Sequence, residues 1–390
     1  MPPRPMPDFR VCECGFSGMF PRVDSLTQAT LGAAVGEMIL GKRLGNRALA
    51  WGALFGTLPD LDALVSPFFN TAGKLWWHRG PSHSLLVMVL VSYFLAPYLS
   101  KLWKRDKVTR KRAGWFIFAA WSTHVLIDCF TVYGTSVWWP FPARRVAFNH
   151  LFIIDLMFTM PMLVALVWLA FLRSKKQLPK RRRLNAWGLG LATAYALLSV
   201  GAKFAASAGF DADLARRGVS YNRRMEAPSP FNIILWRSVV DRGNEFWVGY
   251  RTVFERHSTP VRWTIYPKGA DALAGMEDLS EVKTLQWFSD GWWIARPHVK
   301  GAWIGDMRFG EMRSWGDKKG MVDSRLSFAW DVMPDATGDR VRTIFPSREK
   351  TGEQLRRMGL RLVGNRDDWE ANPRLAGVTG SFPEFLAVEE

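Results

Sequence analysis

Residues 113–133 read AGWFIFAAWSTHVLIDCFTVY, an apolar run close to the length of about 20 residues that crosses a bilayer as a helix. The run nevertheless carries His124 and Asp128, which lie four positions apart and therefore share one face of a helix. Ionisable groups inside a membrane segment are costly unless they are paired or functional. The run predicts a membrane helix with a candidate functional pair.

Apolar runs on both sides of this helix predict an α-helical membrane bundle of about six segments. Three more runs are near the spanning length, and two earlier runs of about 15 residues are short for full spans. The long runs are 84–103, 151–172 and 185–206, and the short runs are 26–41 and 44–58. Gly and Ala in the short runs would permit close contact, so these two could instead form a helical hairpin packed against the others.

Charge divides the chain into unlike parts. The 390 residues include 52 Lys+Arg and 35 Asp+Glu, a net charge of +17, yet only seven of the acids lie within 24–206. We therefore predict a flexible N-terminal extension (1–23), a helical membrane domain (24–206) and a water-facing β-rich domain (207–390). The three cysteines exclude a disulfide framework.

Short aromatic and β-branched stretches follow residue 220. They are 231–240, 246–255, 261–266, 283–288, 291–296 and 325–333, and turn signals such as Asp-Arg-Gly (241–243) separate them. This pattern is typical of an antiparallel sheet. Residues 348–360 predict a helix, followed by a loop-rich tail. We expect Trp292 and Trp293 to pack in the core rather than bind lipid or sugar.

Basic residues concentrate in alternate connections. The connections 42–47, 101–112 and 173–183 are rich in Lys and Arg, whereas 59–83 and 134–150 carry two such residues each. By the positive-inside rule the first set is cytoplasmic, which places the C-terminal domain outside the cytoplasm of a bacterial-type inner membrane. Anionic lipid head groups account for the positive charge, so we expect membrane lipid and no nucleic acid as a partner.

Most residues of the first half that could bind a metal fall on the same expected outer side. They are Asp24, Asp60, Asp62, His78, His83, His124, Asp128, His150 and Asp155, with Gln28 one turn from Asp24. Imidazole with carboxylate suits Zn²⁺, Mn²⁺ or Fe²⁺. Each motif alone is more often a helix cap or a hydrogen-bonded pair, and for Asp24 and Asp155 capping stays an alternative. Their convergence predicts one metal site.

Five ordered motifs resemble the YdjM-like family of inner-membrane-associated, metal-dependent hydrolases. They are DSLTQA (24–29), GTLPDLD (56–62), HRGPSHS (78–84), THVLID (123–128) and FIID (152–155), and the resemblance extends to about residue 250. It implies a membrane-bound hydrolase whose site includes Asp24, Asp60, Asp62, His78, His83, His124, Asp128 and Asp155. The remote similarity of that family to zinc-dependent phospholipase C and to certain nucleases implies a phosphoester substrate.

The expected function is metal-assisted hydrolysis of a phosphoester or lipid-like substrate at the outer membrane face. Zinc is the expected metal, with manganese and iron as alternatives; its ligands would be Asp60, Asp62, His78, His83, His124, Asp128 and Asp155. Asp24 or a site carboxylate would orient the water, and Arg79 would clamp a phosphate. The alternative is a non-enzymatic metal transporter or scaffold. A transporter needs ionisable groups deep in the bilayer or on both sides, so clustering on one side favours hydrolysis.

Overall fold

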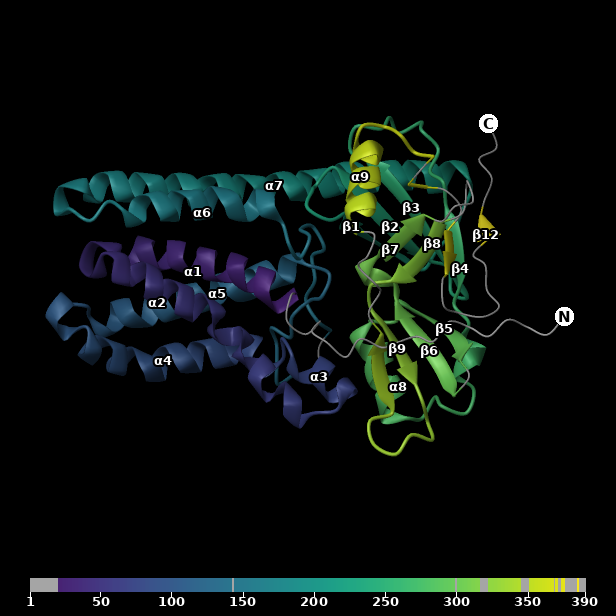
Figure 1. The fold of residues 1–390 in the computed structure, drawn as a ribbon, viewed down its shortest axis with the longest axis horizontal. Helices are drawn as coiled ribbons and strands as arrows, with labels where there is room; N and C mark the ends of the chain where they lie inside the picture. The colour runs from purple at the N-terminus through teal and green to yellow at the C-terminus, as the bar shows by residue number, and fades with distance from the viewer. Residues whose placement is uncertain are drawn as a thin grey trace.

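A computed structural model describes residues 20–141, 144–298, 300–315, 322–344, 351–367, 369–370, 373–375 and 384–385. Residues 1–19 of the expected N-terminal extension lie outside these ranges. A helical bundle formed by the first half of the chain stands beside β-sheets formed by the second half (Figure 1). The predicted order, a helical part followed by a β-rich part, is confirmed.

Among the residues that the structure describes, four stretches of the helical part are long and apolar enough to cross a membrane: Asn46–Phe68, Leu85–Leu102, Arg110–Phe130 and Lys175–Arg216. Its helices are α1 (Phe20–Leu44), α2 (Asn46–Thr57), α3 (Thr71–Trp77), α4 (Leu85–Leu102), α5 (Arg110–Phe130), α6 (Leu156–Ala170) and α7 (Leu178–Arg216). The 3₁₀ segment η1 (Leu58–Phe68) continues α2, and the 3₁₀ turn η2 (Pro81–His83) precedes α4.

Helices α1 and α2 form a close hairpin, which the sequence left open as an alternative, and α2 together with η1 is also long enough to cross a membrane. Gly45, with a positive φ of 56°, provides the turn between them. A Cβ atom at Gly32 would collide with the carbonyl oxygen of Gly52, and one at Gly36 would collide with that of Ala48. The two backbones touch because small residues line the interface.

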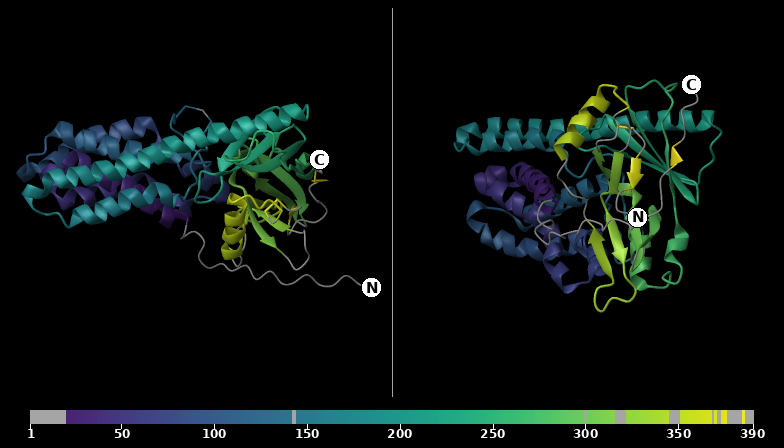
Figure 2. Two further views of the ribbon diagram at one scale, coloured as in Figure 1. Left: turned by 90° about the horizontal axis from the view of Figure 1, so that it is seen from above. Right: turned by 45° about the vertical axis from the view of Figure 1, so that its right-hand side comes forward.

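Several helix ends differ from the prediction, among them the start of α6 and both ends of α7. Helix α6 begins at Leu156 rather than at 151, because the Asp155 side chain caps it by accepting from the backbone N–H of Met157. Helix α7 continues past 206 to Arg216, and its buried residue Phe210 packs against the β-rich part. A single helix therefore runs from the bundle into the second half of the chain (Figure 2).

The described residues of the β-rich part form three sheets, with strand orders β1-β2-β3-β4-β12, β10-β9-β6-β5 and β11-β8-β7. All pairs are antiparallel except β11 with β8. The strands are β1 (Arg223–Pro228), β2 (Leu235–Asp241), β3 (Glu245–Thr252), β4 (Thr264–Pro267), β5 (Trp293–His298), β6 (Gly301–Asp306), β7 (Glu311–Trp315), β8 (Val322–Leu326), β9 (Ala329–Val332), β10 (Val341–Ile344), β11 (Pro373–Leu375) and β12 (Glu384–Phe385). Helices α8 (Ser280–Phe288) and α9 (Thr351–Leu362) accompany them.

Most predicted strands are confirmed, and one is wrong. The stretches that contain strands are 231–240, 246–255, 261–266, 291–296 and 325–333, and α9 overlaps the helix predicted at 348–360. Residues 283–288 instead belong to helix α8. Val282, Leu285 and Phe288 recur every three residues and are all buried, so they form one helical face rather than a strand's alternation.

The core of the β-rich part is aromatic. Trp292 and Trp293 are both buried, as predicted, and Trp236 and Trp263 pack with Phe210 of α7. The connections α1–α2, α4–α5 and α6–α7 lie at the end of the bundle away from the sheets (Figure 1). These are the basic connections, and their assignment to the cytoplasmic side stays a prediction.

Candidate metal centre

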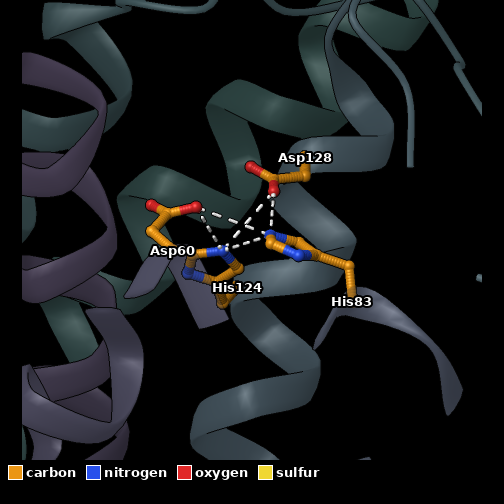
Figure 3. A group of neighbouring side chains, drawn as sticks. All are labelled: Asp60, His83, His124 and Asp128. Carbon is orange, nitrogen blue, oxygen red and sulfur yellow. Dashed lines mark hydrogen bonds and ion pairs between the residues drawn. The ribbon is translucent and has the colours of Figure 1, made fainter. Parts of the chain in front are cut away.

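Four ionisable side chains converge at the end of the bundle that faces the β-rich part. Asp60 comes from η1, His83 from η2, and His124 and Asp128 from neighbouring turns of α5 (Figure 3). One donor atom from each residue lies within 4.8 Å of all the others. His83, His124 and Asp128 are buried, and Asp60 is partly exposed.

The distances between these donor atoms suit a small metal ion. The Nε2 atoms of His83 and His124 are 3.0 Å apart. Oδ2 of Asp128 lies 3.2 Å from His83 Nε2 and 3.4 Å from His124 Nε2, and Oδ1 of Asp60 lies 3.5 and 3.4 Å from the same atoms. Ligands bound at zinc–ligand distances in a tetrahedron lie roughly 3.3 Å from one another. The residues present therefore fit a divalent ion.

The hydrogen bonding of the two carboxylates also favours a cation. Within the described part of the chain, the buried atoms Oδ1 of Asp60 and Oδ2 of Asp128 accept no hydrogen bond of good geometry. Buried polar atoms are rarely left in this state. Both oxygens face the same two imidazole nitrogens, so a cation shared by the four atoms would satisfy them.

The hydrogen bonds of the Nδ1 atoms, which point away from the site, determine the tautomers of His83 and His124. Nδ1 of His124 lies 2.6 Å from the carbonyl oxygen of Gly56, which can only accept, so Nδ1 carries the proton. Nδ1 of His83 lies 2.9 Å from Oγ of Ser82, whose hydroxyl donates to Asp62 at 3.0 Å. His83 Nδ1 is therefore a donor too. Both Nε2 atoms keep lone pairs for the site, the arrangement usual for metal-bound histidines.

Burial and charge act in opposite directions on His83. Burial penalises the imidazolium, but the nearby carboxylates of Asp128 and Asp60 outweigh that penalty and raise the pKa of His83 above its usual value. The surrounding carboxylates thus favour positive charge at this point of the structure.

Asp62 and His78, which the sequence also predicts as ligands, lie beside the four-residue group. Oδ1 of Asp62 is 3.0 Å from Nδ1 of His78, and its Oδ2 accepts from the backbone N–H of Arg79 at 2.9 Å and from Ser82. Asp62 therefore holds the 78–82 turn in place. The indole Nε1 of Trp121 anchors the same turn to α5 by donating to the carbonyl oxygen of Ser82 at 2.9 Å.

The Arg79 side chain reaches the same site. Its Nη2 lies 3.2 Å from Oδ1 of Asp128, its Nη1 donates to Oγ1 of Thr131 at 3.3 Å, and the guanidinium sits 5.0 Å from the ring centre of Tyr133. The φ of Arg79 is 56°, a left-handed value uncommon for a residue with a side chain. Such conformations gather at functional sites.

The remaining predicted residues have other places. Asp155 is outside the four-residue group: it caps α6 and accepts from the Tyr195 hydroxyl at 3.0 Å. Nδ1 of His150 lies 2.7 Å from Oγ of Ser199. The side chain of Asp24, near the start of α1, lies outside the described residues. Gln28 donates to Oδ1 of Asp128 at 2.8 Å and so supports a site carboxylate.

Sequence reasoning missed Ser82, Gly56 and Tyr133. Ser82 stands between the two predicted histidines, which was the available signal, because a hydroxyl there can reach a neighbouring ring. The contact of Gly56 is made by a backbone carbonyl, and no side-chain pattern reveals it. Tyr133 packs with Phe309 and Phe328 of the β-rich part, a contact that depends on the tertiary fold.

The helical part matches a known family. Residues 23–206 match the family model described as YdjM inner membrane protein. Residues 23–206 are thus similar to this family, and we call them the YdjM region. Over 117 residues, the chain is 30% identical to the inner membrane protein YbcI of Escherichia coli (strain K12); this match covers 30% of the chain and 66% of that protein. No solved structure gives a significant match. The metal-centre residues all lie within the YdjM region.

Proposed function

We propose that the YdjM region is a metal-dependent hydrolase that acts on a phosphoester at the membrane surface. The observation that carries the proposal is the meeting of four donor atoms, two of them carboxylate oxygens without a hydrogen bond among the described residues. Nitrogen and oxygen donors in this number favour zinc, and they also suit manganese and iron. Asp60, His83, His124 and Asp128 would hold the ion.

A divalent ion bound there would lower the pKa of a water molecule and polarise the bond to be broken. The protein supplies the rest. Arg79, already directed to Asp128, binds phosphate oxygens through its guanidinium. Asp62 keeps the turn that carries Arg79 and His83 in register. Asp24 stays the proposed carboxylate that orients the water, and His78, Asp62 and Asp155 remain further candidates for metal binding.

The place of the site supports a substrate of the membrane. Asp60 lies in a stretch apolar enough to enter a bilayer, at the end of the bundle where the helices stop. We therefore propose a lipid or lipid-like phosphoester, hydrolysed on the extracytoplasmic side of an inner membrane. A transporter or scaffold is the rival function. The clustering of the donor groups at one end of the bundle favours hydrolysis over transport.

Metal content tests the proposal. Mass spectrometry on the detergent-purified chain should find about one divalent ion per molecule, and His83→Ala and His124→Ala should each lose it. His150→Ala is the matched control, because His150 is also buried but lies outside the four-residue group. Each variant is first compared with the wild type for thermal unfolding. A screen of phosphoesters then follows on the metal-loaded protein.

Two outcomes would contradict the proposal. If the wild type binds no stoichiometric metal after zinc and manganese are resupplied, the cluster is a structural polar network and the scaffold function takes over. If metal is bound but accumulates inside vesicles without hydrolysis of any phosphoester, the protein is a transporter.

A further inference from the structure

A cavity of about 360 Å³ lies where the bundle meets the β-rich part. Asp60, His78 and Arg79 line it from the helical side, and Arg237, Tyr250 and Glu311 line it from the β-rich side. It therefore connects the candidate metal centre with the second half of the chain. Its size falls in the range of small-molecule binding sites.

Most of the cavity wall is apolar. Val132, Phe152 and Ile153 contribute from the helical part, and Phe309, Met312 and Phe328 contribute from the β-rich part. The rings of Phe309 and Phe328 stack with centres 4.4 Å apart. A wall of this kind gains free energy by covering hydrocarbon, so it suits an occupant with an apolar portion.

Three arginines give the cavity its polar character. Arg79 comes from the helical part, and Arg237 and Arg308 come from the β-rich part. Arg237 pairs with Glu311 at 2.7 Å, and Arg308 pairs with Asp306 at 2.6 Å; all four residues are buried. Guanidinium groups held in this way suit an anionic group such as a phosphate.

The buried Nε–H of Arg237 is a donor that a ligand could use. Its Nη1 donates to the carbonyl oxygen of Met307 and its Nη2 to Glu311. Its buried Nε finds no acceptor among the described residues, although a buried donor normally has one. An acceptor atom of a molecule in the cavity would satisfy it.

Apolar side chains stand on the same segment as Asp60. Segment η1 lends Asp60 and Ala63 to the cavity and exposes Leu64 and Phe68, whose exposed fractions are 69% and 84%. Large exposed apolar side chains beside a membrane bundle are favourable in contact with lipid. The segment that contributes Asp60 to the cavity therefore also carries side chains suited to contact with lipid.

We propose that this cavity binds an amphiphilic phosphoester, with its phosphate at Arg79 and the metal centre and its apolar portion between the two parts of the chain. The inference rests on the proposed function for the phosphate end. It adds that the β-rich part is one half of the substrate site and selects substrates with a hydrocarbon group. Arg237 and Arg308 would hold further polar atoms of the same molecule.

Binding of a phosphonate tests this inference separately from hydrolysis, because a carbon–phosphorus bond is not cleaved by a phosphoesterase. The probes are octylphosphonate and methylphosphonate, titrated calorimetrically into the full metal-loaded chain in detergent. We expect octylphosphonate to bind about tenfold or more tightly than methylphosphonate, since only its tail reaches the apolar wall. Turnover is measured in parallel with octyl phosphate.

Cavity-filling variants locate the binding site. Ser327→Trp and Pro230→Trp add a large ring to the wall, and Ser258→Trp is the matched control because Ser258 is exposed and does not line the cavity. Both wall variants should weaken octylphosphonate about tenfold and leave metal content unchanged, while Ser258→Trp behaves like the wild type. Partitioning of the probe into detergent is the same for all three variants.

The outcomes separate the two proposals. Equal binding of both phosphonates, or unchanged octylphosphonate binding in both wall variants, would overturn the amphiphile cavity and leave the hydrolase function standing. Octylphosphonate binding that the wall variants weaken, without hydrolysis of octyl phosphate or of any phosphoester in the screen, would support the cavity and remove the hydrolase function.

Discussion

Arg79 combines three structural roles at a single position. Its backbone N–H donates to Asp62, its guanidinium pairs with Asp128, and its side chain packs on Tyr133, which contacts the β-rich part. The turn that brings these contacts together requires a positive φ. A substitution here can keep the charge while changing the geometry in which the charge is held.

Arg79→Lys should reduce turnover by about 10- to 100-fold, because an ammonium cannot bind a phosphate with two parallel hydrogen bonds. Metal content should not change, since Arg79 is not one of the four converging donors. The ratio kcat/KM for a phosphoester identified by the screen provides the measurement. A variant with wild-type turnover would show that Arg79 serves the fold alone.

At the scale of residues, the sequence predicted which side chains gather near the candidate metal centre better than it predicted what each side chain contacts. The spacing of His124 and Asp128 on one helix was enough to bring them together. Asp60 and Asp62 could not be told apart, because which of them faces the histidines depends on η1. Positions two apart on a 3₁₀ helix point about 120° away from each other, so one carboxylate enters the group and the other turns to His78.

Helix α1 approaches α2 so closely that the interface has no space for a methyl group at Gly32. We expect Gly32→Ala to lower the free energy of unfolding by about 1–3 kcal/mol, because only a shift of the backbone can relieve the collision. Since α2 leads directly into η1, metal affinity should fall as well. Thermal unfolding and metal content measure the two effects.

The matched control is Gly190→Ala in α7, where a Cβ atom meets nothing within 4 Å. Alanine favours a helix over glycine by about 1 kcal/mol, so this variant should be neutral or stabilised. Equal effects at both positions would mean that close packing of α1 on α2 is unimportant.

A buried ion pair joins helices α1 and α7 in the bundle. Arg181 pairs with Glu37 through two bonds of 2.6 and 3.0 Å, and both residues are buried. Glu37→Ala leaves a buried guanidinium without its carboxylate and should destabilise the fold by about 3–5 kcal/mol. Replacing both residues by Met should recover part of that loss.

The exposed pair Arg47–Asp106 is the control for this prediction. Its N–O distance is 3.1 Å, but the Arg47 side chain is 57% exposed, so Asp106→Ala should cost at most about 1 kcal/mol. Chemical denaturation of the detergent-solubilised variants compares the two pairs. Similar losses of stability for the two pairs would show that the buried pair stabilises the fold no more than the exposed pair does.

Element types were predicted where the pattern was long or clearly alternating. The apolar runs gave the helices because about 20 consecutive apolar residues leave few alternatives. Helix α8 was missed because its nine residues carry only three core positions, and a short apolar stretch fits either period. Helix α6 begins after its cap at Asp155 and not where the apolar run begins, so the length of the run alone predicted the wrong boundary.

The bundle and the β-rich part share a core at the end of α7. Phe210 is fully buried, with its ring centre 5.8 Å from that of Trp263. Phe210→Ala should destabilise the whole chain by about 3–5 kcal/mol, measured by thermal unfolding in detergent. Phe204→Ala on the same helix, 71% exposed, is the control and should change little. If only the β-rich signal shifts, the two parts unfold independently.

At the scale of the molecule, composition showed that the chain has two unlike parts but not how they join. The contacts that join them are made by residues far apart in sequence, such as Tyr133 with Phe309. A sequence pattern within either part carries no information about the contacts between the two parts. The cavity and the role of the β-rich part in it therefore had to come from the structure.

Because α7 is continuous, it fixes the rotation and the distance of the sheet arginines relative to the metal centre. One added residue turns everything beyond it by about 100° and advances it by about 1.5 Å. An insertion of a single alanine near Gly201, where the helix surface is open, would rotate Arg237 and Phe309 away from Asp60. Insertion of a whole turn would restore the rotation but would move the β-rich part about 5.4 Å along the helix axis. The natural chain should therefore tolerate few changes of length at this point.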